Sequence, residues 1–195
     1  MRVGVLALQG DFREHIRMLD GLGVEGVEVR TPDELARVDA LVIPGGESTT
    51  IGRLARLYGL IEPIRAAAEG GMPMLGTCAG MIFLASSTVE HDQPQLGVLD
   101  AVVRRNAFGR QVDSFEADLD VVGFDDPMHA VFIRAPWIAK VGGDVDVLAS
   151  VEDDSGSHPV LVQQGRILAT SFHPELTDDA RLHALLIDLV HGMEE

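Results

Sequence analysis

Cys78 is the only cysteine in this chain of 195 residues, and it stands between two glycines in the stretch GTCAG (residues 76–80). Apolar residues precede and follow the stretch, a pattern typical of a buried strand, a sharp turn and a helix. We expect Gly76 and Gly80 to allow this turn, which holds the side chain up in a cleft where the free N–H groups of the helix N-terminus stabilise a thiolate. A free cysteine can also be a small buried hydrophobic residue. The prediction that Cys78 is a nucleophile therefore needs a second observation.

That observation is a histidine and a carboxylate in the segment ATSFHPELT (residues 169–177). Pro174 disfavours the helical region for His173, so we expect an extended segment in which His173 and Glu175 face the same side. Glu175 could accept the Nδ1 proton, leaving Nε2 to take the thiol proton and give it to a leaving amine. Without Cys78 this would be a strand-end histidine beside a surface glutamate. With Cys78 it predicts a catalytic triad.

The loop PGGES (residues 44–48) could supply the third part of such a site. Two glycines let the backbone approach a developing oxyanion, so we predict an oxyanion hole formed by the N–H groups of Gly46 and Ala79. Taken alone, Gly-Gly after a strand is often only a turn, and phosphate-binding loops look similar. This loop lacks the lysine of a nucleotide-binding P-loop.

Metal and cofactor sites are not indicated. One cysteine cannot form an internal disulfide, and no Cys/His cluster offers zinc enough soft ligands. The remaining histidines show no ligand spacing, and we expect them on the surface or in the core: His15, His91, His129, His158, His183 and His191. We therefore predict no metal and no cofactor.

The composition sets limits on the class of protein. A hydrophobic content of 46% over 195 residues predicts one compact domain, residues 1–195, with a full core. No apolar run reaches the roughly 18 residues of a spanning helix, and charge appears too early for a signal peptide, so we expect a cytoplasmic protein without membrane segments. The 15 basic and 31 acidic residues give a net charge of −16, which disfavours nucleic-acid binding. Arginine is concentrated only in VVRRNAFGR (residues 102–110).

The elements that must position these residues follow an alternating pattern in the first half of the chain. Continuous apolar runs at residues 3–8, 40–43 and 72–75 read as buried strands, and helical spacing covers residues 12–22 and about 49–70, with a break near Pro63. In TPDEL, Thr31, Pro32 and Glu34 form a capping box that starts a short helix. Successive βα units predict an α/β fold with an open, mostly parallel sheet flanked by helices on both faces. Ligand sites in such sheets lie beyond the carboxyl ends of the strands, where the loops QGD, PGGES and GTCAG occur.

After about Thr88 the pattern changes to short strands separated by turn residues, which predicts an antiparallel or mixed extension. QQGR (residues 163–166) reads as a hairpin turn. A last helix is expected from about Thr177 to His191, with Asp178 and Asp179 in its first turn. Its apolar stripe is expected to comprise Leu182, Leu185, Leu186 and Leu189.

The motifs PGGES, GTCAG and SFHPE in this order resemble the class I, triad-type glutamine amidotransferases. The blocks LALQGDFREH, PGGEST, GTCAG, RRNAFGRQVDSFE, VFIRAP and SFHPELT together are similar to the family of glutaminase subunits of pyridoxal 5′-phosphate synthase. The resemblance runs from about residue 3 to 177, and the blocks NAFGRQVDSFE (residues 106–116) and IRAP (residues 133–136) separate this family from other amidotransferases. No catalytic position departs from the family pattern.

The resemblance implies a fold, an activity and a set of residues. It implies a flavodoxin-like glutaminase that hydrolyses L-glutamine to L-glutamate and ammonia through a thioester, with Cys78 as nucleophile, His173 as base and Glu175 as its orienting acid. It also implies a glutamine site lined by Gly46, Glu47, Ser48, Arg105, Ile133 and Arg134. An arginine suits such a site because the α-carboxylate of glutamine accepts charge-assisted hydrogen bonds.

The resemblance further implies a partner. In this family ammonia passes to a barrel-shaped synthase subunit of the PdxS type, in a hetero-oligomer that makes the vitamin B6 cofactor from ribose 5-phosphate and glyceraldehyde 3-phosphate. A protected path is required because free ammonia protonates in bulk water. Related glutaminases are poorly active alone, and we expect the oxyanion peptide at Gly45-Gly46 to face the wrong way until the partner docks.

Three other functions remain open from the sequence. The chain could be the glutaminase of another synthase, such as that of histidine biosynthesis. It could be a binding or regulatory module that keeps the fold without catalysis, although the intact triad argues against this. It could be a cysteine hydrolase acting on peptides, which the acidic loop and arginine pattern disfavour.

Overall fold

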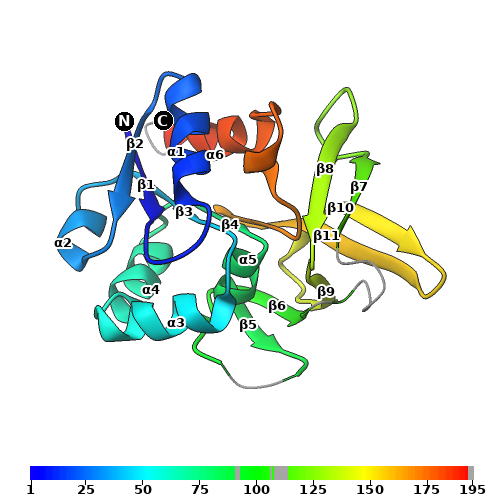
Figure 1. Ribbon diagram of the computed structural model, residues 1–195, viewed down its shortest axis with the longest axis horizontal. Helices are drawn as coiled ribbons and strands as arrows, with labels where there is room; N and C mark the ends of the chain where they lie inside the picture. Colours follow the sequence, from blue (N-terminus) through cyan, green and yellow to red (C-terminus); the bar gives the residue numbers. More distant parts are fainter. Residues whose placement is uncertain (91–92, 106, 108–113, 193–195) are drawn as a thin grey trace.

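The computed structural model describes residues 1–90, 93–105, 107 and 114–192 of the chain (Figure 1). Its largest element is a seven-stranded sheet with the order β10-β11-β12-β4-β3-β1-β2. Five neighbouring strands run parallel, namely β2 (Glu25–Val29), β1 (Arg2–Leu6), β3 (Ala40–Ile43), β4 (Met74–Thr77) and β12 (Ile167–Thr170). β11 (Gly156–Gln164) and β10 (Asp146–Asp153) add an antiparallel edge. The mostly parallel sheet with a mixed extension is confirmed.

Helices cover both faces of this sheet (Figure 1). α1 (Phe12–Gly21) and α6 (Arg181–His191) lie on one face, and α3 (Ser48–Leu57), α4 (Ile61–Glu69) and α5 (Ala79–Leu84) on the other. Successive residues of a strand point to opposite faces, so Val42 packs with α1 and α6 whereas Leu41 and Ile43 pack with the other helices. Both sides of the central strands are apolar, which is why their sequences read as continuous hydrophobic runs.

Two smaller sheets complete the described part of the chain. β5 (Ala85–Thr88), β6 (Leu99–Arg104) and β9 (Trp137–Val141) form one, and β7 (Ser114–Leu119) pairs with β8 (Met128–Ile133) in the other. The β7–β8 hairpin packs on the main sheet through Phe132, which makes an edge contact with Phe172 at 5.6 Å between ring centroids. This contact brings the end of β8 beside the segment that follows β12.

Local sequence signals predicted some helix boundaries correctly and others wrongly. The capping box at the start of α2 (Pro32–Leu35) is present, with Thr31 and Glu34 bonded reciprocally. The expected break near Pro63 is wrong, because the chain turns at Gly59, whose φ is +69°. Pro63 instead lies in the first turn of α4, where an N–H group has no helical partner to lose.

The last helix also differs from its prediction. It begins at Arg181 rather than near Thr177, because residues Pro174–Leu176 form a short 3-10 turn, η1. Asp179 therefore precedes the helix, where its carboxylate accepts hydrogen bonds from the Arg181 backbone at 3.1 Å and from the Arg181 guanidinium. In the apolar stripe, Leu182 and Leu186 are fully buried, whereas Leu185 and Leu189 are half-buried.

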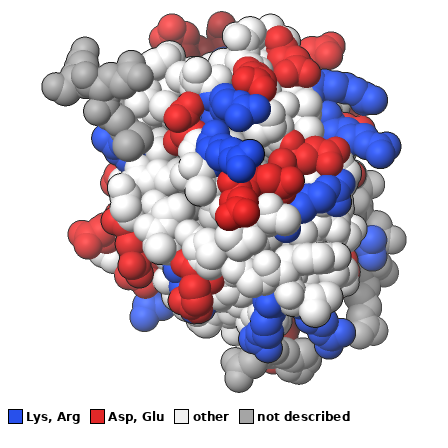
Figure 2. All heavy atoms as spheres, turned by 90° about the vertical axis from the view of Figure 1, so that its left-hand side faces the viewer, with Lys and Arg blue, Asp and Glu red and all other residues white. Residues whose placement is uncertain are grey.

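Acidic and basic side chains are interspersed on the face that carries the edge strand β2 (Figure 2). Arg2 pairs with Glu25 at 2.8 Å, and Arg30 pairs with Glu28 at 2.9 Å. Charged side chains on an edge strand discourage its pairing with a strand of another chain. Among the described residues, no helix has the length and apolar character needed to cross a bilayer.

Candidate active site

The predicted nucleophile and base meet because two strands far apart in the sequence are neighbours in the sheet. β4 and β12 run parallel with Thr77 opposite Thr170, so both end at the same edge. Directly beyond that register, the Cys78 N–H donates a hydrogen bond to the Thr170 carbonyl at 2.7 Å. Cys78 and the segment leading to His173 therefore leave the sheet side by side.

The backbone at Cys78 has a conformation that non-glycine residues rarely adopt. Its φ is +48° and its ψ −102°. Cys78 and Arg134, with φ of +42°, are the two non-glycine residues with positive φ in the described part of the chain, and both line the same cavity. Each such conformation costs about 1–3 kcal/mol and persists where the surroundings impose it, often at functional sites.

The glycines on either side of Cys78 serve a different purpose from the one expected. Neither Gly76 nor Gly80 has a positive φ, so the sharp turn falls on Cys78 itself. They are required for close approach. A Cβ atom on Gly76 would meet the Leu84 side chain, and one on Gly80 would meet the Ile43 carbonyl. The two glycines thus let α5 lie directly against β3 and β4.

His173 and Glu175 are brought together by a turn rather than by an extended strand. His173 itself is non-helical, as Pro174 requires, but residues Pro174–Leu176 then form the 3-10 turn η1. This turn carries the Glu175 carboxylate back over the ring, and His173 Nδ1 donates to Glu175 Oε1 at 2.6 Å. The expected contact is present, although the expected extended backbone is wrong. The His173 backbone N–H is anchored by the Val131 carbonyl of β8 at 2.9 Å.

The charge state of His173 follows from its surroundings. Burial disfavours the imidazolium, but hydrogen bonds with Cys78 and Glu175 and their negative charge outweigh it and raise the pKa of His173 to about 10. The ring therefore carries its proton at neutral pH. A cationic imidazole beside the sulfur stabilises a thiolate, which is the reactive form of a cysteine.

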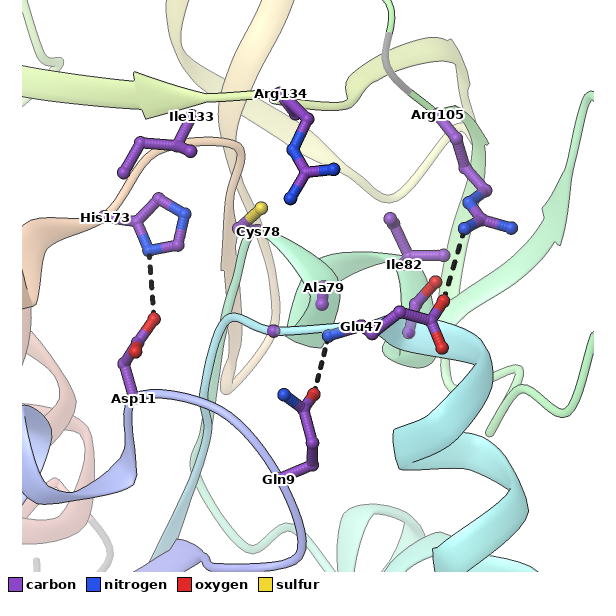
Figure 3. A pocket seen from close by; sticks show the side chains of 12 residues that line it. Gln9, Asp11, Glu47, Cys78, Ala79, Ile82, Arg105, Ile133, Arg134 and His173 are labelled. Atoms are coloured by element: carbon purple, nitrogen blue, oxygen red, sulfur yellow. Dashed lines mark hydrogen bonds and ion pairs between the residues drawn. The ribbon is translucent and has the colours of Figure 1, made fainter. Parts of the chain in front are cut away.

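The loop Pro44–Ser48 lies between the β1–α1 loop and the triad. The Gly45 carbonyl accepts a hydrogen bond from the Asp11 N–H at 3.3 Å. Gln9 Oε1 accepts one from the Glu47 N–H at 2.6 Å, as Figure 3 shows. Because a trans peptide points its N–H opposite to its carbonyl, the Gly46 N–H points away from the β1–α1 loop. The loop is thus held from one side by the residues that follow β1.

Glu47 caps α3 and carries a fixed negative charge. Its carboxylate accepts hydrogen bonds from the backbone of Thr49 and Thr50 and from the Thr50 hydroxyl. Partial burial opposes ionisation, but these bonds outweigh it and lower the pKa of Glu47 to about 2. The Arg105 guanidinium lies 3.5 Å from the same carboxylate. Opposite charges therefore stand together at the rim of the site.

These groups enclose a cavity of about 380 Å³, a size that suits a small-molecule ligand. In the view of Figure 3 the Cys78 sulfur lies between the His173 ring and the Arg134 guanidinium. The cavity contains the predicted nucleophile, base, oxyanion residues and substrate contacts, namely Cys78, His173, Gly46, Ala79, Glu47, Ser48, Arg105, Ile133 and Arg134. Glu175 is buried behind His173.

Sequence reasoning missed three residues of this site. Gln9, Asp11 and Ile82 also line the cavity. Asp11 Oδ2 lies 3.9 Å from His173 Nδ1. The position of QGD after the first strand was the available signal for Gln9 and Asp11. Residues 106 and 108–113 of the block RRNAFGRQVDSFE, and His91, lie outside the described residues.

One group of carboxylate and imidazole ligands in the described ranges is compact enough for a metal ion, and it consists of Asp11, His173 and Glu175. His173 Nδ1 is already committed to Glu175, and the protonated ring repels a cation. The arrangement thus favours acid–base chemistry with a sulfur nucleophile. It provides a thiol, a charged imidazole, an orienting carboxylate and two backbone segments near a developing oxyanion.

Comparisons with known proteins find similar proteins among the glutamine amidotransferases. The model of the SNO glutamine amidotransferase family matches residues 5–191. The chain is 60% identical to the pyridoxal 5′-phosphate synthase subunit PdxT of Frankia alni over 98% of this chain and 96% of that protein. It is 57% identical to the subunit of the same name from Mycobacteroides abscessus, over 97% of each chain. A crystal structure of a glutamine amidotransferase, 55% identical, superposes with a TM-score of 0.91 over 97% of this chain and 98% of that one.

Proposed function

Because this chain belongs to the SNO glutamine amidotransferase family, we propose that it is the glutaminase subunit of a pyridoxal 5′-phosphate synthase. In this proposal Cys78, His173 and Glu175 hydrolyse the side-chain amide of L-glutamine. The observation that carries the proposal is the shared end of β4 and β12, which sets Cys78 beside a His173 that is already bonded to a buried carboxylate.

The reaction begins with attack of the Cys78 sulfur on the amide carbon of glutamine. A C–S bond forms, and the carbonyl electron pair moves to oxygen, where the N–H groups of Gly46 and Ala79 receive the negative charge. The C–N bond then breaks, and His173 Nε2 gives its proton to the departing ammonia. A thioester remains on Cys78.

The second half of the reaction returns the site to its starting state. His173, now neutral, accepts a proton from a water molecule that attacks the thioester carbon. The C–S bond breaks, glutamate leaves and the sulfur regains its electron pair. Glu175 keeps His173 in the orientation that serves both steps.

The rim of the cavity matches the charges of an amino acid. Arg105 is suited to the α-carboxylate of glutamine, and the ionised Glu47 beside it to the α-ammonium group. Ser48, Ile133 and Arg134 line the remaining wall. The cavity is thus suited to a small zwitterion, which favours glutamine over a peptide.

The product ammonia must reach a synthase without passing through bulk water, where it would protonate. The relatives named PdxT are subunits of a synthase, and we propose a barrel-shaped synthase of the PdxS type as the partner, in the cytoplasm. The Asp11–Gly45 hydrogen bond holds the oxyanion peptide in one orientation. We propose that docking of the synthase activates glutamine hydrolysis while this bond keeps the Gly46 N–H directed away from the β1–α1 loop.

Covalent labelling tests the chemistry. A glutamine analogue with an electrophilic carbon in place of the amide should label Cys78 of the wild type, and L-glutamine should protect it. The Cys78→Ser variant is the control. Absence of labelling in the presence of the synthase would refute the proposed nucleophile.

Transfer of nitrogen tests the identity of the partner. Glutamine labelled with ¹⁵N in its amide should yield ¹⁵N in the pyridoxal phosphate ring when the chain is mixed with the synthase. Incorporation into the product of another synthase instead would favour the histidine-type glutaminase. Glutamine hydrolysis that is as fast for the isolated chain as for the complex would contradict activation by docking.

A further inference from the structure

A line of buried polar side chains continues behind the proposed triad. His15 Nε2 lies 3.4 Å from Glu175 Oε2 and bonds the Thr77 hydroxyl oxygen at 3.2 Å. His15 Nδ1 is 2.8 Å from His183 Nε2. Cys78, His173, Glu175, His15 and His183 therefore form a continuous row through the interior.

The two added histidines come from elements that take no other part in the site. His15 lies on α1 and His183 on α6, on the face of the sheet where these two helices pack. Both have no exposed surface. A buried polar group without a hydrogen-bond partner destabilises the folded protein. The hydrogen-bond partners of these two buried histidines therefore need to be identified.

Both histidines are neutral. Burial lowers the pKa of His183 to about 4. Burial, together with the nearby His183 and His173, lowers the pKa of His15 well below its usual range. Each ring then carries one proton. The ring nitrogen that holds this proton decides which residue of the row donates each hydrogen bond and which accepts it.

The neighbouring groups determine which nitrogen of each ring carries the proton. Glu175 Oε2 is buried and has no hydrogen-bond partner, and it faces His15 Nε2. If that nitrogen lacked a proton, a lone pair would face a carboxylate oxygen, and His15 Nδ1 would donate to His183. His183 would then hold its proton on Nδ1, which is buried without a partner. If both rings instead carry their protons on Nε2, the unpartnered His183 Nδ1 has only a lone pair, and the His15 Nε2–H faces Glu175.

We propose that His15, held in its Nε2–H form by a hydrogen bond from His183 Nε2, is a positioning residue for Glu175. In this form the His15 Nε2–H bonds the Thr77 hydroxyl oxygen and also lies 3.4 Å from Glu175 Oε2, while Oε1 receives the proton of His173. A carboxylate approached on both oxygens cannot rotate away from the ring. The proposal rests on the proposed function, because it assigns His15 to the same triad.

Three titratable side chains surround the Glu175 carboxylate. His173 belongs to the same segment, His15 comes from α1 with His183 behind it, and the Asp11 carboxylate lies within 4.8 Å of the ligand atoms of both His173 and Glu175. Asp11 is half exposed and negative, so it supplies no donor to Glu175. The donor that faces Oε2 is therefore His15.

Two substitutions at His15 separate positioning from packing. The amide nitrogen of glutamine reaches the place of a histidine Nε2, and that of asparagine the place of Nδ1. In complex with the synthase, His15→Gln should keep glutamine hydrolysis near the wild-type rate, whereas His15→Asn should lose about tenfold or more in kcat with KM unchanged. The exposed His129→Gln is the control for loss of a histidine.

A pH titration of His173 by NMR in the same variants adds a readout that packing would not move. The pKa of His173 should fall in His15→Asn and stay near the wild-type value in His15→Gln, because only the asparagine variant frees Glu175. Equal kcat and equal titration in the two variants would overturn the proposal.

The wild-type protein offers a test that depends on neither folding of the variants nor catalysis. Ring ¹⁵N chemical shifts should report a proton on Nε2 of both His15 and His183. A proton on Nδ1 of His15 would overturn the proposal even if Cys78 is labelled by the glutamine analogue. Conversely, failure of that labelling would refute the proposed function and leave the measured tautomers standing.

Discussion

The α-carbon of Gly45 lies against the imidazole of His173. A Cβ atom at this position would stand 2.5 Å from Cε1 and 3.0 Å from Nδ1 of the ring. The loop that is proposed to bind the oxyanion and the residue that is proposed to move the proton therefore share a contact with no room for a side chain. Their spacing is set by the absence of a single methyl group.

Gly45→Ala should consequently displace the His173 ring from Cys78. We expect glutamine hydrolysis to fall by about 100-fold, because a displacement of about 1 Å in a reacting group has that effect. Ammonium-supported synthesis by the complex should remain. Gly143→Ala is the matched control, since a Cβ there meets no atom within 4 Å. Equal activity of both variants would show that the contact is unimportant.

Cys78→Ala removes the proposed nucleophile and leaves its surroundings intact. Glutamine-dependent synthesis should be abolished, whereas synthesis from added ammonium should continue, because the synthase needs only the ammonia. The measurement is product formation by the assembled complex with each nitrogen source. Loss of both activities would indicate that Cys78 has a structural role.

His173→Asn and Glu175→Gln test the division of roles within the triad. The histidine variant loses the proton-transfer group, whereas the glutamate variant keeps it and loses its orientation. We therefore expect the larger loss of kcat in His173→Asn. Steady-state glutamine hydrolysis in the complex measures both, and losses of equal size would contradict the assignment.

Arg105→Gln should weaken glutamine binding. The guanidinium lines the cavity beside Glu47, and losing one hydrogen bond to a charged group should raise KM about tenfold. The value of kcat should change less, because Arg105 is proposed to contact a group that does not react. Arg104→Gln changes the same charge at an exposed position of β6. A similar KM for the two variants would remove Arg105 from the substrate site.

Stability should fall in acid because His183 must be neutral in the folded state. Its folded pKa is about 4 against roughly 6.5 in the unfolded chain. The unfolded chain binds more protons between these values, so the free energy of unfolding decreases as pH falls from 6.5 to 4. The contribution of His183 is about 3 kcal/mol.

Urea unfolding at pH 7 and pH 4.5 of the wild type and of His183→Gln measures this contribution, because glutamine can still donate toward His15 without titrating. The variant should lose less stability on acidification. His129→Gln should do the opposite, because hydrogen bonds with Asp118 and Glu116 raise the pKa of His129 in the folded state. Identical pH dependence in wild type and His183→Gln would contradict the buried neutral ring.

Much of the site could be predicted because its parts follow strands. Cys78 and the Gly45-Gly46 pair come directly after buried apolar runs, and the ends of parallel strands gather at one edge. Pro174 marked the segment around His173. The sequence does not reveal that Gly76 and Gly80 serve helix packing while Cys78 takes the positive φ, because composition does not distinguish a glycine needed for space from one needed for its backbone angle.

The part that could not be predicted depends on contacts between distant segments. His15 and His183 are 168 positions apart, and neither shows a motif, so they could only be assigned to surface or core. The break after α3 was placed at Pro63 because proline ends helices, yet in a first turn it is harmless. The 3-10 turn at Glu175 begins at Pro174, and proline is also favoured at the first position of a helical turn, so Pro174 was compatible with either backbone.

The place of β12 in the sheet has a consequence for how the protein is made. This strand lies between β11, the strand directly before it in the chain, and β4, which ends at Thr77. A nascent chain that has left the ribosome through residue 160 contains Cys78 and the Gly45-Gly46 loop but lacks His173, the proposed base. On the proposed mechanism, the chain can consume glutamine only after β12 is inserted and brings His173 beside Cys78.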